Sequence, residues 1–148
     1  MKKEFIPYEQ ALALKELGFN EPCMAIYYSK DKSFSWHHHK DHTNDEPILD
    51  SGEFNISAPL YQQAFRWFRK KYNIHAEITW SPSYEYDPGE WYGVVLEITF
   101  VDVSYTKEWK AESPDMQRGE GKQLTYEEAE LACLKKLIKI VKEKLLTI

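Results

Sequence analysis

Residues 58–80 read APLYQQAFRWFRKKYNIHAEITW, and within this stretch the spacing of apolar residues changes from helical to alternating. The first part predicts an amphipathic helix over 58–72, because its apolar residues recur every three or four positions. Pro59 suits the first turn of this helix, and Ser57 can cap it. The second part predicts a strand over 74–80 with one buried face. That face consists of Ile74, Ala76, Ile78 and Trp80.

The C-terminal part repeats these two patterns in the opposite order. Apolar residues alternate again over 92–103, which predicts a second strand, and a weaker pattern over 105–112 allows a third. A long amphipathic helix is predicted over 125–146, where Thr125 and Glu128 have the spacing of a capping box. We therefore expect an α+β fold, with an antiparallel sheet of three to five strands and two or three helices packed on one face.

The N-terminal part predicts smaller elements. Residues 7–17 favour a short helix that Gly18 ends, and 23–28 and 34–36 favour a hairpin. Residues 37–53 are polar and contain proline and glycine, so we expect a long mobile loop there. At 148 residues, we expect one domain over 1–148.

Composition narrows the class of protein. The net charge of −5 argues against a general nucleic-acid binder. Cys23 and Cys133 each lie in an apolar run, which suits a reducing compartment and a buried thiol. We expect neither a signal peptide nor a membrane-spanning segment, and hence a cytoplasmic protein.

Aromatic residues form 15% of the chain and provide the first candidate surface. Tryptophan and tyrosine are enriched at protein interfaces because one end of the side chain tolerates water. If these residues gather on the surface, they mark a contact with a partner protein or with a second copy of the chain; otherwise they cover the sheet. The candidates are Trp67, Tyr84, Tyr86, Trp91 and Trp109.

Basic residues on the two long helices form the second candidate surface. The order of elements is similar to that of the double-stranded-RNA-binding domain, which contacts phosphates and the shape of the duplex. Glu127, Glu128 and Glu130 stand where that domain requires cations, so nucleic-acid binding is an alternative that the sequence disfavours. The candidate cations are Arg66, Arg69, Lys70, Lys135, Lys139 and Lys142.

A histidine-rich segment, HHHKDH at 37–42, is the third candidate. Imidazoles are suitable zinc ligands, and His37, His39 and His42 are the metal candidates. Adjacent histidines cannot all converge on one ion, and no distant Cys/His set completes a site, so a solvated polar loop without a cofactor is favoured. No G-x-S-x-G, glycine-rich phosphate loop or C-x-x-C motif is present, so the sequence names no catalytic residue and favours a non-enzymatic role.

Three blocks of the chain resemble small uncharacterised proteins of Bacteroidales bacteria and their phages or prophages. The blocks are PYE at 7–9 with LGFNEPC at 17–23, ISAPLYQQAFRWFR at 56–69, and TYEEAE at 125–130. The resemblance implies an accessory protein of a mobile element and carries over no catalytic residue. With the aromatic excess, it leads to the expectation of a non-enzymatic protein-interaction module that acts on another protein or forms a homodimer.

Overall fold

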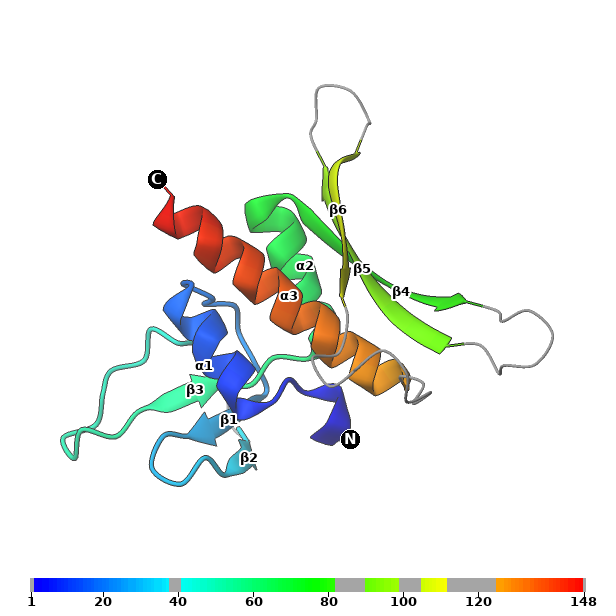
Figure 1. The fold of residues 1–148 in the computed structure, drawn as a ribbon. Coiled ribbons are helices and arrows are strands. Elements are labelled where there is room, and N and C mark those ends of the chain that lie inside the picture. Colours follow the sequence, from blue (N-terminus) through cyan, green and yellow to red (C-terminus); the bar gives the residue numbers. More distant parts are fainter. Residues whose placement is uncertain (1, 38–40, 82–89, 99–104, 112–124, 148) are drawn as a thin grey trace. The chain divides into compact units, whose positions relative to one another are not determined.

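The fold is α+β, as the sequence predicts, and its strands form two three-stranded antiparallel sheets (Figure 1). The computed structural model describes residues 2–37, 41–81, 90–98, 105–111 and 125–147, with the backbone alone at 81, 90–98 and 105–111. The chain divides into two compact units, residues 1–64 and 65–148. The prediction of a single domain stays a prediction.

The first unit is a small sheet with one helix. It contains a 3-10 turn η1 (Lys2–Glu4), helix α1 (Tyr8–Glu16) and strands β1 (Ala25–Tyr28), β2 (Phe34–Trp36) and β3 (Asn55–Ser57). Strand β1 is central and pairs antiparallel with both β2 and β3. The predicted hairpin is therefore confirmed, whereas strand β3 was not expected.

Glycine ends helix α1 as predicted. Gly18 has φ +85°, a conformation that a side chain disfavours, and the Phe19 amide then donates to the Leu14 carbonyl over 2.9 Å. This turn places Phe19 in the core of the first unit, where Ile6, Leu14, Ile26 and Ile56 are also buried.

The second unit is a three-stranded sheet with a long helix against it. Helix α2 (Tyr61–Tyr72) begins in the first unit and ends in the second, and strands β4 (Ile74–Ser81), β5 (Glu90–Ile98) and β6 (Tyr105–Ala111) follow. They pair antiparallel in sequence order, which confirms the weakly predicted third strand. Helix α3 (Tyr126–Leu146) packs against all three strands.

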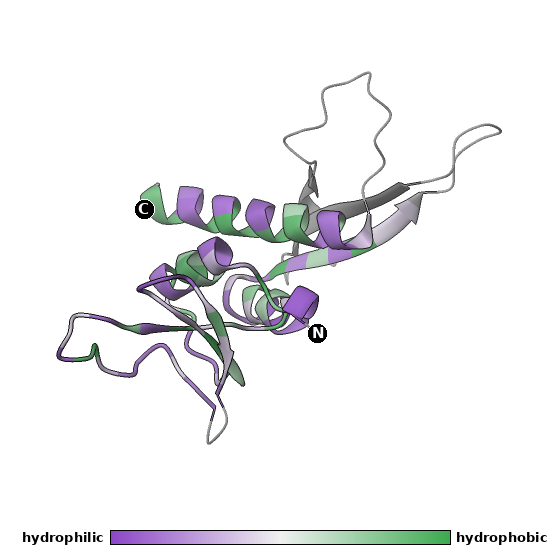
Figure 2. Ribbon diagram, turned by 90° about the horizontal axis from the view of Figure 1, so that it is seen from below, coloured by the Kyte–Doolittle hydropathy of each residue, from purple (hydrophilic) through white to green (hydrophobic). Residues whose placement is uncertain are grey.

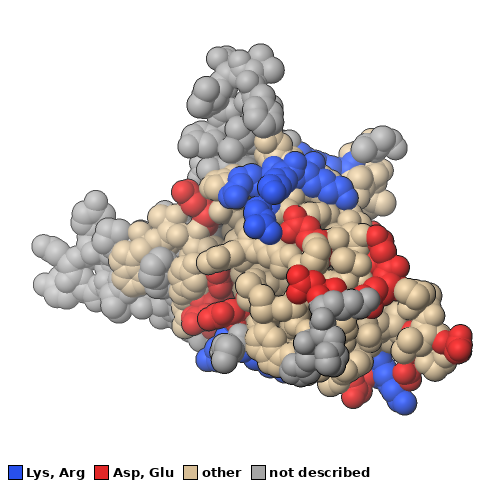
Figure 3. All heavy atoms as spheres, turned by 180° about the vertical axis from the view of Figure 1, so that it is seen from behind, with Lys and Arg blue, Asp and Glu red and all other residues tan. Residues whose placement is uncertain are grey.

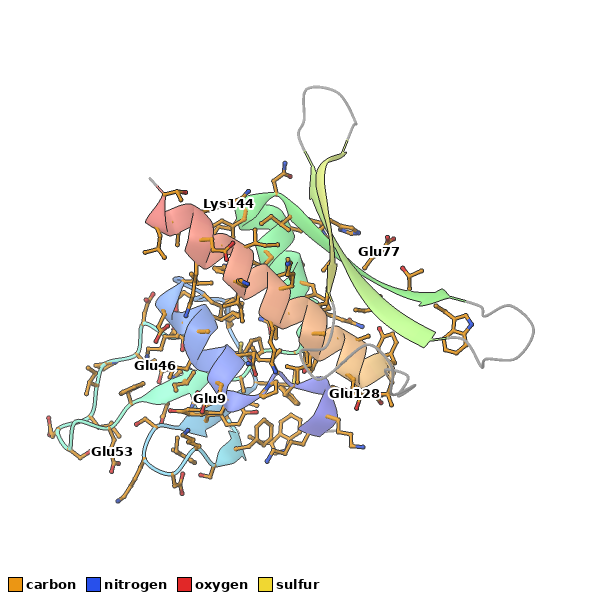
Figure 4. All side chains as sticks on the ribbon, in the orientation of Figure 1. Glu9, Glu46, Glu53, Glu77, Glu128 and Lys144 are labelled. Carbon is orange, nitrogen blue, oxygen red and sulfur yellow. The ribbon has the colours of Figure 1, made fainter. Side chains whose placement is uncertain are left out.

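Helix α3 is amphipathic along most of its length (Figure 2). Its buried residues recur at helical spacing, and its charged residues lie between them. Glu128 lies at the N-terminal end of α3 and Lys144 at the C-terminal end (Figure 4), where each charge complements the helix dipole. The buried residues are Ala129, Ala132, Cys133, Leu134, Leu137, Ile138, Ile140 and Val141.

Strand register distributes apolar residues over both faces of the second sheet. Directly opposite residues of an antiparallel pair lie on the same face. Ala76 pairs with Val95, whereas Glu77 pairs with Val94 and His75 with Leu96. The apolar face of β4 therefore lies on one side of the sheet. Val94 and Leu96 of β5 lie on the other side.

Two details of the helix–strand stretch differ from the prediction. Helix α2 begins at Tyr61, and Ser57 does not cap it: Ser57 is the last residue of β3, and its hydroxyl contacts a buried histidine, described below. Trp80 was placed on a buried face, but 46% of the residue is exposed.

The capping box of α3 provides a test of local stability. The Thr125 hydroxyl accepts from the Glu128 amide over 3.2 Å, and the Glu128 carboxylate accepts from the Thr125 amide over 2.9 Å. Thr125→Ala is expected to lower the free energy of unfolding by about 0.5–2 kcal/mol, because it leaves the Glu128 amide without its cap. Thr125→Ser keeps the hydroxyl and is the matched control in urea unfolding. Equal losses in both variants would contradict a role for the cap.

Candidate functional site

Strand register brings tryptophans together on one face of the second sheet. Trp80 of β4 lies directly opposite Trp91 of β5. Ala76 lies four residues before Trp80 in β4 and therefore on the same face. It pairs with Val95 of β5, and Val95 pairs with Trp109 of β6. Trp80, Trp91 and Trp109 therefore share a face, which we call the tryptophan face. Trp80 is the member whose exposure is described, and nearly half of it is accessible.

The sequence missed Trp80 as a surface candidate. Alternation places it in line with Ile74, which is fully buried, and alternation alone cannot show where along a strand the covering layer ends. The available signal was its position near the end of β4, far from Ile74.

The other aromatic candidates have different outcomes. Trp67 is 6% exposed, and its ring packs against Phe68 and Tyr72 at centroid distances of 5.0 and 5.4 Å. It therefore belongs to the buried part of α2 and offers no surface. Tyr84 and Tyr86 lie outside the described residues. Trp91 and Trp109 are placed by their strands, and their exposure stays a prediction.

The basic candidates are exposed on both helices. Arg66, Arg69 and Lys70 lie on the outer side of α2, and Lys135, Lys139 and Lys142 on that of α3. Figure 3 shows a group of Lys and Arg side chains on the face opposite to that of Figure 1, with others elsewhere on that face. Exposed charges of this kind can contact phosphates and equally suit a solvated helix face.

Part of the histidine segment is hydrogen-bonded to other parts of the first unit, and the expectation of a mobile polar loop over 37–53 stays a prediction. His42 is 1% exposed and forms a backbone bridge with Cys23, with both amide-to-carbonyl distances 2.8 Å. Its Nδ1 lies 2.8 Å from the Ser57 hydroxyl, and its Nε2 lies 3.5 Å from a Glu46 carboxylate oxygen. The imidazole therefore ties this segment to β3, and the His42 backbone ties it to the chain before β1.

Two asparagines complete the anchor. The Asn44 amide donates to the Phe19 carbonyl over 2.8 Å, and its oxygen accepts from the Ser57 amide over 3.0 Å. Asn20 bonds the side chain of Asp45 and accepts from the Asp45 amide. The side chains of His42, Asn44 and Asp45 thus each form a hydrogen bond with a distant part of the first unit.

The metal prediction gains little from this arrangement. The His37 and His42 rings lie 5.6 Å apart between centroids, edge to face, and His39 lies outside the described residues. Among the residues that the structure describes, no three His, Cys, Asp or Glu side chains are grouped to hold a metal ion. Zinc binding through His37, His39 and His42 stays a prediction.

The contacts of Ser57, His42 and Glu46 follow the order of a nucleophile, base and carboxylate. A catalytic serine must reach its substrate, however, and both Ser57 and His42 are buried. The neighbouring thiol is also inert: burial raises the pKa of Cys23 to about 12, and that of Cys133 likewise to about 12. This cluster anchors the segment, and its geometry does not expose a nucleophile.

The two thiols give a pH-dependent prediction. Each pKa rises from 9.0 to about 12 on folding, so below pH 9 both states keep the proton and stability is unaffected. Between about pH 9 and 12 the unfolded thiols ionise first, so stability is lost as pH rises. Urea unfolding at pH 8, 9 and 10 measures this loss, and Cys133→Ser should reduce it.

A second measurement tests burial of the thiols directly. Ellman's reagent is expected to leave both cysteines unmodified in the native protein at pH 8 and to modify both in urea. Rapid modification of the native protein would contradict the buried positions.

Comparison with known proteins leaves the family open: no family model, no curated protein and no solved structure matches the chain. Within the described residues, no helix combines the length and the apolar character needed to span a membrane.

Proposed function

We propose that this chain is a non-enzymatic protein-interaction module and that its contact surface is the tryptophan face of the second unit. The observation that carries the proposal is the half-exposed Trp80, placed directly opposite Trp91. Large aromatic side chains dominate binding energy at interfaces, because each buries much area at a small entropic cost.

The way in which the tryptophan face is covered supports this proposal. Ile74, at the other end of β4 on the same face, is fully buried, whereas Trp80 is 46% exposed. The layer that covers this face therefore ends before Trp80, and a partner can bury the exposed end. An exposed tryptophan beside a covered apolar row is a natural anchor for a partner protein.

The edges of the sheet suggest how a second copy would bind. Strand β4 is an edge of the described sheet and is eight residues long. A long edge strand can pair with a strand of another chain, and a neighbouring tryptophan adds apolar contact to that pairing. The partner is therefore another protein or a second copy that forms a homodimer. The three-block resemblance supports a role as an accessory protein of a mobile element in the bacterial cytoplasm.

Two tryptophan substitutions test the proposal. Trp80→Arg is expected to weaken self-association or partner capture by about tenfold or more, because it removes the apolar anchor while leaving the core intact. Trp67→Ala is the contrasting variant: it should lower the free energy of unfolding by about 3–5 kcal/mol, because it removes a buried side chain. Light scattering after size exclusion, pull-down and urea unfolding provide the readouts.

The control is Met24→Ser, which changes an exposed apolar residue in the first unit. It should alter neither association nor stability. A wild-type protein that is monomeric and captures nothing would overturn the proposal, as would unchanged binding by Trp80→Arg.

RNA binding is a second candidate, because the order α2-β4-β5-β6-α3 and the sequential antiparallel sheet match those of the double-stranded-RNA-binding domain. Exposed Arg69 and Lys70 on α2 would contact phosphates. The exposed Glu127 in the first turn of α3 opposes this candidate, since it would repel a phosphate placed there.

Salt dependence tests RNA binding. If the helix cations bind phosphates, affinity for an RNA duplex of about 20 base pairs should fall at least about tenfold between 50 and 200 mM salt. Arg69→Glu with Lys70→Glu should weaken binding at low salt, and Lys30→Glu in the first unit is the charge-matched control. Absence of a fluorescence-anisotropy change at 50 mM salt removes this candidate.

A further inference from the structure

Strand β4 is the sheet edge with the least protection against pairing with another strand. Native sheets guard their edges with lysine, proline, bulges or very short strands. Edge strands β2 and β3 have three residues each, and edge strand β6 carries Lys107 and Lys110. Strand β4 has eight residues without lysine or proline, and its register with β5 runs unbroken from Ile74 to Ser81. Among the strands that the structure describes, β4 is therefore the edge best suited to accept a further strand.

A second copy of β4 offers a strand of equal length. Two antiparallel copies related by a twofold axis pair residues symmetrically about one centre. Because directly opposite residues lie on the same face, that centre is a residue of the strand. A centre at Ile78 pairs 75–81 of the two copies and a centre at Glu77 pairs 74–80, whereas every other centre pairs a shorter stretch. These two registers are the longest that β4 can form with itself.

Charge decides between the two registers. Glu77 is exposed, and β4 contains no other Asp, Glu, Lys or Arg. A centre at Glu77 places two carboxylates directly opposite each other, which destabilises a strand pair. A centre at Ile78 instead places Glu77 opposite Thr79 of the second copy, whose hydroxyl can donate to the carboxylate. The register centred at Ile78 is therefore favoured.

The same register also covers the exposed tryptophan. It places Trp80 opposite Ala76 of the second copy, and Ile78 opposite Ile78. Ala76 and Ile78 are half-buried on the tryptophan face, so both have apolar area left to cover, and the small alanine leaves room for the indole. Residues 65–148 contain nearly equal numbers of acidic and basic residues, so net charge opposes this pairing little.

We infer that the chain forms a homodimer in which two β4 strands pair antiparallel about a twofold axis at Ile78. The inference rests on the proposed function, because it names a second copy of the chain as the partner that covers the tryptophan face. Main-chain hydrogen bonds between the two strands supply affinity, and the side chains of Glu77 and Trp80 select the register.

Opposite charges at position 79 test the register. Thr79→Glu places a carboxylate opposite Glu77 of the second copy, twice by symmetry, so the dissociation constant of the dimer should rise about three- to tenfold. Thr79→Lys is the matched control: it places an ammonium group there and should leave the constant unchanged or lower it. Thr79 and Trp80 are adjacent in the strand and lie on opposite faces, so neither variant alters the tryptophan face. Sedimentation equilibrium of the full chain measures both constants.

Disulfide trapping tests the same register by distance. The variants Glu77→Cys and Thr79→Cys carry different affinity tags and are oxidised separately and as a mixture. The mixture should give a tag-mixed dimer in several-fold higher yield than the dimer of either variant alone, because only residues 77 and 79 lie directly opposite each other. Cys23 and Cys133 are buried, and oxidised wild type controls for their reaction.

The results separate this inference from the proposed function. Opposite responses to Thr79→Glu and Thr79→Lys, with the dimer lost in Trp80→Arg, would support both. A monomer that still captures another protein through Trp80 would overturn the β4 dimer and leave the tryptophan-face contact standing. Equal responses to the two charges, or equal disulfide yields from mixed and single variants, would also overturn the β4 dimer alone. A chain that neither self-associates nor captures a protein would overturn both.

Discussion

Burial of the apolar side of α3 against β4, β5 and β6 is the interaction on which the second unit depends. Five large aliphatic residues of this helix are buried, and each is worth about 1.5–3 kcal/mol relative to exposure. Ordering the backbone costs about 1–2 kcal/mol per residue, so a 21-residue helix gains its stability from this packing more than from its own propensity. Strand register forms the tryptophan face on the same sheet, and burial along that face decreases from Ile74 to Trp80.

The first unit depends on a different kind of constraint. Its core is apolar, but the segment between β2 and β3 is positioned by His42 and Asn44, which meet at Ser57. Buried polar groups are costly when they lose a partner, so this arrangement stabilises one path of the chain against alternatives.

Local pattern predicted much of this fold, because the relevant interactions lie within a few residues. Helical spacing located α2 and α3, alternation located β4 and β5, and Thr125 and Glu128 are only three residues apart. Long-range contacts were not predictable in this way. Ser57 has the composition of a helix cap, and nothing near it in the sequence shows that a histidine fifteen residues earlier would take its hydroxyl.

Register explains the rest of what the sequence could not provide. Alternation identifies two faces for each strand but not which face of β4 is aligned with which face of β5. The pairing of Ala76 with Val95, and of Glu77 with Val94, makes the sheet apolar on both sides. From the two strands read separately, a sheet with one buried face was the natural expectation. Trp80 was assigned to that buried face for the same reason.

The hydroxyl, imidazole and thiol groups that meet in the first unit are buried. A catalytic site places its nucleophile and base where a substrate can reach them. Here the hydroxyl of Ser57, the imidazole of His42 and the thiol of Cys23 are buried and bonded to one another or to nearby groups, so they act as internal supports. The exposed side chains of the described residues include charged groups on α2 and α3 and large apolar residues such as Trp80. An exposed apolar side chain contributes affinity when a partner buries it.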